Sequence, residues 1–143
     1  MGMTKPEVDQ FLSSGTMIMR MATVDAKGDA VIHPVWYLYE NDRIYMFTSK
    51  NRKLDNILRR GRVYFSIDTD AMPNKGVKGK GKASVVSEDH RRVSLGEKIV
   101  RKYMGDSQTE YAKALLNYAK GPKSNVIEIA PEYYTVWDYS KLM

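Results

Sequence analysis

Four side chains that could bind a phosphate group stand together where a predicted strand runs into a predicted helix. The strand ends at Thr48 and Ser49, and the basic helix that follows begins with Arg52 and Lys53. Hydroxyls, the unpaired N–H groups of a helix start and two cationic side chains are donors that suit a phosphate. The same segment also allows a purely structural interpretation, because Ser49 or Asn51 would cap the helix without any ligand.

The remaining candidates for chemistry are few. His33 has no carboxylate or hydroxyl near it in the sequence to orient it, so packing or hydrogen bonding is favoured over acid–base catalysis. Trp36 and Trp137 could stack on a planar ring or simply fill a core. The chain has no cysteine and only one other histidine, His90, far from the first. The sequence therefore predicts no metal site and identifies no catalytic residue.

A glycine- and lysine-rich run, KGVKGKGKAS, occupies residues 75–84. Its glycine spacing fits a P-loop, but Ala83 stands where that loop needs a serine or threonine, and a strand follows in place of a helix. The run also predicts a basic ribbon that could bind nucleic acid. Its members are Lys75, Lys78, Lys80 and Lys82. Nucleic-acid binding is disfavoured because most tyrosines fall at core-facing positions.

Composition points to one domain spanning residues 1–143. No apolar run approaches the ~20 residues that span a bilayer, and Glu7 and Asp9 stand where an export signal would be apolar. We therefore expect a cytoplasmic protein without membrane segments. The 23 Lys and Arg exceed the 17 Asp and Glu by six, which favours anionic ligands.

The first half of the chain predicts three antiparallel strands and two helices. A capping box at Thr4 and Glu7 starts a helix that runs to about Ser13. Strands follow over residues 16–24 and 30–39 and from residue 43, joined by tight turns as a meander. The phosphate-binding candidates then lead into a helix over residues 53–60 that ends at Gly61.

The second half predicts strands over residues 62–69 and 77–86, a helix over 87–104, and a last strand interrupted near Pro131. Before that strand, a capping box at residues 107–110 starts a further helix with Tyr111, Leu115 and Tyr118 on its inner face. Six antiparallel strands with flanking helices indicate a mainly β protein, built as a closed or split barrel. Because both faces of strand 30–39 are apolar, we expect a second copy to cover the outer one in a homodimer.

Three segments resemble the pyridoxamine 5′-phosphate oxidase-like family of flavin-binding split barrels, which are six-stranded antiparallel Greek-key barrels. They are residues 21–68, residues 80–84 (KGKAS) and residues 125–138 (NVIEIAPEYYTVWD). The resemblance implies an oxidoreductase that transfers hydride through flavin mononucleotide (FMN) bound between two subunits. It also implies the residues that hold the cofactor: Thr48, Ser49, Arg52 and Lys53 at the phosphate, and His33, Pro34, Val35 and Trp36 at the isoalloxazine ring.

The sequence departs from the family pattern in two ways, and these limit which substrate we expect. The loop between Thr48 and Arg52 is one residue shorter than usual, and the sequence has no counterpart of the extension that binds pyridoxal phosphate in the true oxidases. Vitamin B6 is therefore not the expected substrate, and the substrate stays unidentified. A related branch uses an 8-hydroxy-5-deazaflavin coenzyme, whose acidic tail would suit the basic ribbon. The sequence is also compatible with a non-enzymatic flavin or haem carrier and with a nucleic-acid-binding barrel.

Overall fold

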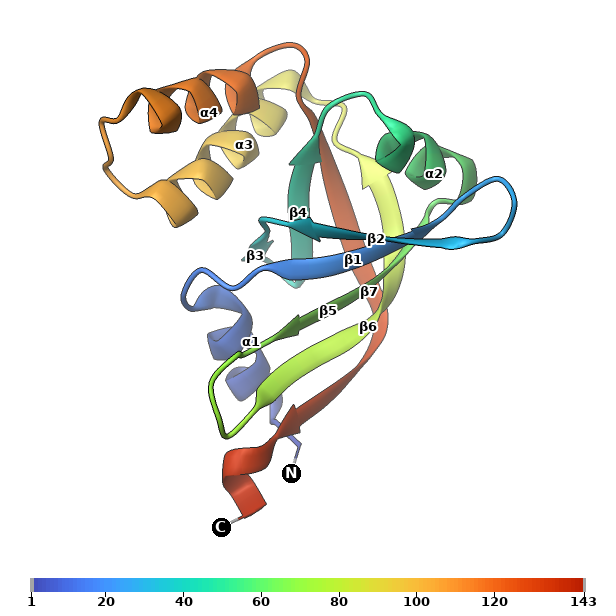
Figure 1. Cartoon of the computed structure of the whole chain (residues 1–143), viewed down its shortest axis with the longest axis vertical. Coiled ribbons are helices and arrows are strands. Elements are labelled where there is room, and N and C mark those ends of the chain that lie inside the picture. Colours follow the sequence, from blue (N-terminus) through green and yellow to red (C-terminus); the bar gives the residue numbers. More distant parts are fainter. Residues whose placement is uncertain (1, 143) are drawn as a thin grey trace.

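A curled antiparallel sheet of seven strands forms the body of the protein, and four α-helices lie around it (Figure 1). The computed structural model describes residues 2–142. The strands are β1 (Met19–Val24), β2 (Ala30–Val35), β3 (Leu38–Glu40), β4 (Arg43–Thr48), β5 (Arg62–Asp68), β6 (Lys75–Val85) and β7 (Asn125–Asp138). The expected split barrel with flanking helices is confirmed, with seven strands in place of six.

The extra strand arises because the expected strand over residues 30–39 is broken. Hydrogen bonding orders the strands as β2-β1-β5-β6-β7-β4-β3, so β2 and β3 lie at opposite edges of the sheet although they are consecutive in the chain. The predicted three-strand meander is therefore wrong, since β2 pairs with β1 and β3 pairs with β4. The chain crosses from one edge to the other at Trp36 and Tyr37, which is where the barrel is split.

Tyr37 has no strand neighbour at this crossing, and the helix α3 (Asp89–Met104) takes that place. The N–H of Tyr37 donates to the hydroxyl of Tyr103 at 3.1 Å, and its carbonyl accepts from Nζ of Lys102 at 2.9 Å. Burial lowers the pKa of Lys102 to about 8. Side chains from α3 thus satisfy both backbone groups that the break would leave unpaired.

The other helices are α1 (Lys5–Ser13), α2 (Arg52–Arg60) and α4 (Glu110–Lys120), and a short 3-10 helix covers Tyr139–Leu142. The predicted capping box at Thr4 and Glu7 is present, and Gly61 ends α2 in the left-handed conformation with φ 63°. Within residues 2–142, no helix is long and apolar enough to cross a membrane.

The structure corrects the prediction for α4. Thr109 is its N-cap and accepts from the N–H of Ala112, so the expected capping box at residues 107–110 does not form. Tyr111 is 63% exposed and does not belong to the inner face, which is instead buried at Ala112 and Ala119. Small residues are used here because α3 and α4 approach closely: a side chain at Gly96 would collide with the backbone of Ala119.

The last strand also differs from the prediction, because β7 continues through Pro131. The register shifts there: Gly81 pairs with Pro131, whereas Lys80 pairs with Tyr133. Glu132 is therefore the extra residue of a β-bulge. A bulge tolerates proline because the ladder is already interrupted at that point.

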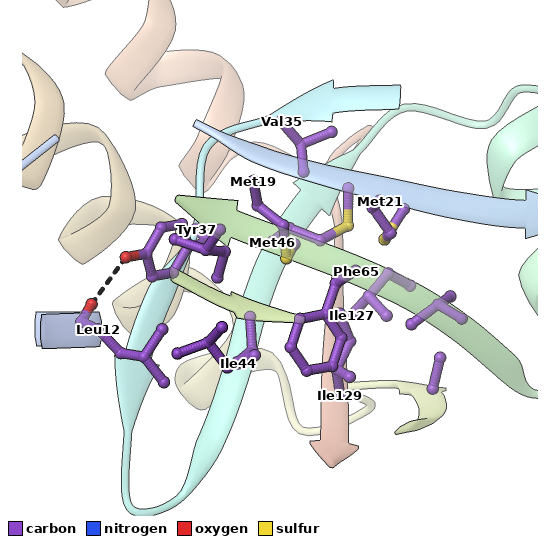
Figure 2. Packing of buried hydrophobic residues seen from close by; sticks show 14 of the residues in the cluster. Leu12, Met19, Met21, Val35, Tyr37, Ile44, Met46, Phe65, Ile127 and Ile129 are labelled. Atoms are coloured by element: carbon purple, nitrogen blue, oxygen red, sulfur yellow. Dashed lines mark hydrogen bonds between the residues drawn. The ribbon is translucent and has the colours of Figure 1, made fainter. Parts of the chain in front are cut away.

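The interior of the curled sheet holds the main hydrophobic core (Figure 2). Met19, Met21 and Met46 are completely buried, and they pack with Ile127 and other aliphatic residues of β4 and β7. Tyr37 lies at the edge of this cluster and donates its hydroxyl proton to the carbonyl of Leu12 at 2.8 Å. This bond joins α1 to the crossing between β2 and β3.

We expect Gly79→Ala to lower the free energy of unfolding by about 1–3 kcal/mol, because overpacking forces the backbone to shift. A Cβ atom at Gly79 would collide with the carbonyl oxygen of Tyr133 on the paired strand β7. Urea denaturation followed by circular dichroism measures the change. Lys78→Ala is the control, because Lys78 is exposed on the same strand. Equal midpoints for the two variants would contradict the close approach of β6 and β7.

Candidate functional site

The junction between β4 and α2 brings the predicted phosphate-binding residues to one place. Thr48 is the buried last residue of β4, and its hydroxyl donates to the carbonyl of Ser49 at 3.1 Å. Of the two predicted caps, Asn51 is the N-cap of α2: its side chain accepts from the N–H of Leu54 at 3.3 Å. The Asn51 amide also donates to the exposed Ser49 hydroxyl at 3.1 Å, which leaves the hydroxyl proton of Ser49 available to a ligand.

Arg52 and Lys53, the first two residues of α2, form neither an ion pair nor a side-chain hydrogen bond within residues 2–142. Arg52 is exposed, whereas Lys53 is half-buried. Burial removes water from around Lys53 and lowers its pKa, because the charged form of the side chain is destabilised. A bound anion would supply the missing negative charge, and the free N–H groups of the first helical turn would add to its binding.

His33 on β2 lies beside this junction. Its Nε2 is 2.9 Å from the hydroxyl of Thr23 on β1. Burial lowers the pKa of His33, and the positive charge of Lys53 lowers it further. The two segments that the sequence singled out, around His33 and around Lys53, therefore meet in space although twenty residues separate them.

The three residues after His33 lie in different surroundings. Pro34 is exposed, and the side chain of Val35 belongs to the core, so Val35 can offer a ligand only its backbone. Trp36 is half-buried and stacks on Tyr103 with 4.6 Å between ring centroids and 3° between planes. One face of the indole is thus occupied, and a planar ligand could use only the other.

Trp137, the second tryptophan that could stack on a ligand, is held elsewhere. Its Nε1 donates to the side-chain oxygen of Asn74 at 2.6 Å, and its ring covers Gly76. This contact explains why position 76 is a glycine, since a Cβ atom there would collide with the indole. Trp137 has a structural role at the end of β7 and does not join the junction of β4 and α2.

Two polar residues of this site were missed from the sequence. Asn56 and Thr23 are both buried, and the Asn56 amide donates to the Thr23 hydroxyl at 3.0 Å. Asn56 lies between Leu54 and Ile57, the other two buried residues of α2. An amide on the apolar face of a short helix is a signal that could have been found, because a buried amide requires hydrogen-bond partners.

A groove of about 420 Å³ opens on the outer face of β1, β5, β6 and β7. We call it the outer groove; its lining includes Arg20, Ile32, Tyr64, Lys78 and Tyr133. Three lysines of the predicted ribbon share this outer face, because they stand at every second residue of β6. They are Lys78, Lys80 and Lys82.

Lys75, the fourth predicted member of the ribbon, lies apart from it. Its Nζ is 5.5 Å from the centre of the Phe11 ring and 3.9 Å from a carboxylate oxygen of Asp138. The prediction of a four-lysine ribbon is therefore wrong for this residue. Within the described chain, no three histidine or acidic side chains are grouped so that they could hold a metal ion.

Comparison with solved structures finds this fold repeatedly. A conserved hypothetical protein from Mycobacterium tuberculosis matches with a TM-score of 0.83 and 25% identity, over 98% of this chain and 88% of its own. An FAD-binding protein from Mesorhizobium loti matches with a TM-score of 0.70 and 15% identity, over 95% of both chains. A structure described as an F420 reductase matches with a TM-score of 0.69 and 17% identity, over 87% of this chain and 94% of its own.

The sequence itself was compared with curated proteins and with family models. No curated protein gives a match. The family model described as pyridoxamine 5′-phosphate oxidase matches residues 4–138, which is nearly the whole chain and includes every residue of the β4–α2 junction. The chain therefore belongs to the pyridoxamine 5′-phosphate oxidase family, as the three segments of its sequence indicated.

Proposed function

We propose that the protein binds FMN and acts as an oxidoreductase that transfers hydride to or from a small molecule. The observation that carries this proposal is the pair Arg52 and Lys53, which begins α2 without an ion pair in the described chain and leaves Lys53 half-buried. Membership of the family supports a flavin at this position. The FAD-binding protein from Mesorhizobium loti shows that a protein of this fold can hold a flavin.

The donors at the junction fit a phosphate monoester. Such a group carries close to two negative charges at neutral pH, and the site offers two cationic side chains, the Ser49 hydroxyl and the free N–H groups of the first helical turn. Asp25, Asp29 and Asp55 line the same hollow as Arg52, but none of them forms an ion pair with Arg52 or Lys53 within residues 2–142. The Asp25 carboxylate already accepts the N–H groups of Lys27 and Asp29. The positive charge of the junction thus remains available to a ligand.

The bound flavin would supply the hydride chemistry, and the protein would position it. Arg52 and Lys53 would hold the phosphate, and His33 and the backbone of Val35 would border the ring. The open face of Trp36 would restrict how the ring can lie. The site contains no activated nucleophile, because the chain has no cysteine, and Thr48 donates its proton to a backbone carbonyl.

A titration with FMN tests the proposal directly. The purified chain is expected to show flavin absorption bands, or to acquire them when FMN is added, and to quench the fluorescence of the flavin as it binds. Reduction by nicotinamide donors, followed at the same bands, would then distinguish an oxidoreductase from a carrier that binds flavin without turnover. A protein that stays colourless with excess FMN would overturn FMN as the cofactor.

A deazaflavin coenzyme is the second candidate, and the outer face of β6 favours it. Lys78, Lys80 and Lys82 line up beside the outer groove, where Arg20 adds a further positive charge. Such a row suits the acidic tail of the deazaflavin coenzyme, which FMN lacks. Replacing the three lysines by alanine should weaken binding of that coenzyme and leave FMN binding unchanged if the row serves the tail.

We further propose that the protein is a homodimer in which a second copy covers the outer groove. Ile32, Tyr64 and Tyr133 are 70%, 43% and 59% exposed there. Neighbouring apolar groups of this size commonly mark an interaction surface. The resemblance places the flavin between two subunits, which agrees with this position of β2, since Ile32 faces the groove and His33 the junction.

We expect the double variant Ile32→Asp, Tyr64→Asp to raise the dimer dissociation constant at least about tenfold, because two unpaired charges would be buried. Sedimentation velocity over a range of protein concentrations measures the change. The control is Met72→Asp, Tyr111→Asp, which places the same charges at exposed apolar positions elsewhere. A wild-type protein that sediments as a monomer at all concentrations would contradict the proposed dimer.

A further inference from the structure

A chain of four hydrogen-bonded polar side chains leads from the exposed Arg59 of α2, through two buried residues, to the half-buried His33. Nη1 of Arg59 lies 3.1 Å from Oδ1 of Asn56, and Nδ2 of Asn56 lies 3.0 Å from the hydroxyl of Thr23. The Thr23 hydroxyl in turn lies 2.9 Å from Nε2 of His33. Asn56 and Thr23 are 2% and 0% exposed, so the hydrogen bond between them is buried, while the bonds to Arg59 and His33 are partly buried.

The directions of the first two hydrogen bonds in this chain follow from its first member, and that of the third follows from the remaining proton of Thr23. Arginine can only donate, so the atom of Asn56 that faces Arg59 must be the oxygen, and the amide nitrogen must face Thr23. The Thr23 oxygen therefore accepts from Asn56. Within residues 2–142 the Thr23 hydroxyl has only one other hydrogen-bond partner, Nε2 of His33, so its single proton is directed at that nitrogen, which accepts it.

An Nε2 that accepts a hydrogen bond carries no proton, so the proton of a neutral His33 ring must reside on Nδ1. Two conditions keep the ring neutral. Burial disfavours the imidazolium ion, and the nearby positive charge of Lys53 disfavours it further. Among residues 2–142, Nδ1 has no hydrogen-bond partner, and the side chain is only half-buried.

We propose that His33 is held as the neutral tautomer with its proton on Nδ1, and that this N–H donates to an acceptor atom of the bound cofactor beside Lys53. Thr23, Asn56 and Arg59 are the positioning residues that fix the tautomer. The ligand part of this inference rests on the proposed function, whereas the tautomer is a property of the protein alone. A fixed donor favours a ligand that presents an oxygen or nitrogen lone pair at that point.

The tautomer can be measured without any cofactor. His90 is exposed, so His90→Gln leaves His33 as the single imidazole of the chain. In this variant, ¹⁵N NMR of the ring at pH 7.5 is expected to show Nδ1 as the protonated nitrogen and Nε2 as the unprotonated one. Free histidine in water favours the opposite tautomer. A ring protonated on Nε2, or on both nitrogens, would overturn the inference.

Asn56→Asp tests the direction of the relay with an almost isosteric change. A carboxylate cannot donate, so the Thr23 hydroxyl would turn to donate to it, and Nε2 of His33 would have to donate to the Thr23 oxygen. The proton of His33 is then expected to move from Nδ1 to Nε2. Thr23→Val, which removes the donor with little change of shape, is the second variant and should likewise lower the share of the Nδ1 tautomer. A wild-type tautomer in both folded variants would contradict the relay.

Two substitutions at His33 test its contact with the cofactor. Asparagine can place an amide N–H where Nδ1 stands, whereas glutamine places its amide where Nε2 stands. We expect His33→Gln to weaken FMN binding about tenfold and His33→Asn to weaken it clearly less. In the His90→Gln background, added FMN should also shift the Nδ1 resonance of His33.

The outcomes separate this inference from the proposed function. If FMN binds but leaves the Nδ1 resonance unmoved and both variants bind alike, the contact is overturned and the proposed function stands. If neither FMN nor a deazaflavin binds, the proposed function fails and the contact fails with it. The tautomer measured in the free protein then still confirms or overturns the relay.

Discussion

Replacing Arg52 and Lys53 together by alanine is expected to weaken FMN binding by about 10²- to 10⁴-fold. Hydrogen bonds to charged groups contribute about 1.5–3 kcal/mol each, and two such contributions correspond to this range. The loss should be large because neither cation has an ion pair in the described chain that could compensate for the change. Fluorescence titration of FMN measures it. The fold should survive, since truncating Lys53 also removes an unfavourably buried charge.

The matched control removes two cations from α3 and α4. Lys98→Ala, Lys113→Ala lowers the net charge by the same amount at exposed positions of these two helices. It should bind FMN within about twofold of the wild type if specific contacts at the junction matter, because surface charges far from a ligand are screened by salt. Equal weakening in both double variants would show that only overall charge attracts the cofactor. Tight binding by the variant lacking Arg52 and Lys53 would place the phosphate elsewhere.

Much of the β4–α2 junction could be predicted because its signals are local. A hydroxyl pair, an N-cap and two cations lie within six residues, and Gly61 marks the end of the helix. Each of these signals acts through the backbone of its own neighbours, so no knowledge of the rest of the chain is required. The same holds for the capping box of α1 at Thr4.

The break after β2 could not be predicted, because its cause lies far away in the sequence. Residues 34–39 are apolar or aromatic throughout, so the sequence shows no interruption at Trp36 and Tyr37, and Pro34 lies inside β2 itself. The crossing is stabilised by Lys102 and Tyr103, which belong to α3 and pair with the backbone of Tyr37. Tertiary contacts of this kind override a local strand propensity.

The candidate site was predictable in its parts but not in its assembly. The sequence marked His33 as a residue without a neighbour to orient it, and the structure shows that Thr23 and Asn56 provide the orientation from two other elements. Thr23 lies on β1, where an alternating pattern predicts only that the residue faces inward. Its partner Asn56, a polar side chain on the apolar face of α2, could have been recognised in the sequence as needing a partner, but only the structure shows that this partner is Thr23.

Removing the hydroxyl of Tyr103 is expected to be the most costly single-atom change at the barrel split. This hydroxyl donates to the carbonyl of Met17 at 2.6 Å and accepts the N–H of Tyr37 at 3.1 Å. Tyr103→Phe leaves both backbone groups without their partner, at about 1–3 kcal/mol each when they are poorly hydrated. We expect the free energy of unfolding to fall by about 2–4 kcal/mol and the melting temperature by roughly 10 °C.

The phenylalanine variant isolates these hydrogen bonds because it keeps the ring that stacks on Trp36. Calorimetry of Tyr103→Phe against Tyr111→Phe, an exposed tyrosine of the adjoining helix, measures the effect with a matched control. A loss no larger than that of the control would mean that water replaces the hydroxyl at the crossing. A large loss would show that α3 holds the two edges of the barrel together, since Met17 precedes β1, the neighbour of the edge strand β2, and Tyr37 directly precedes the other edge strand, β3. Helix α3 would then also fix the position of Trp36, and with it the open indole face at the proposed cofactor site.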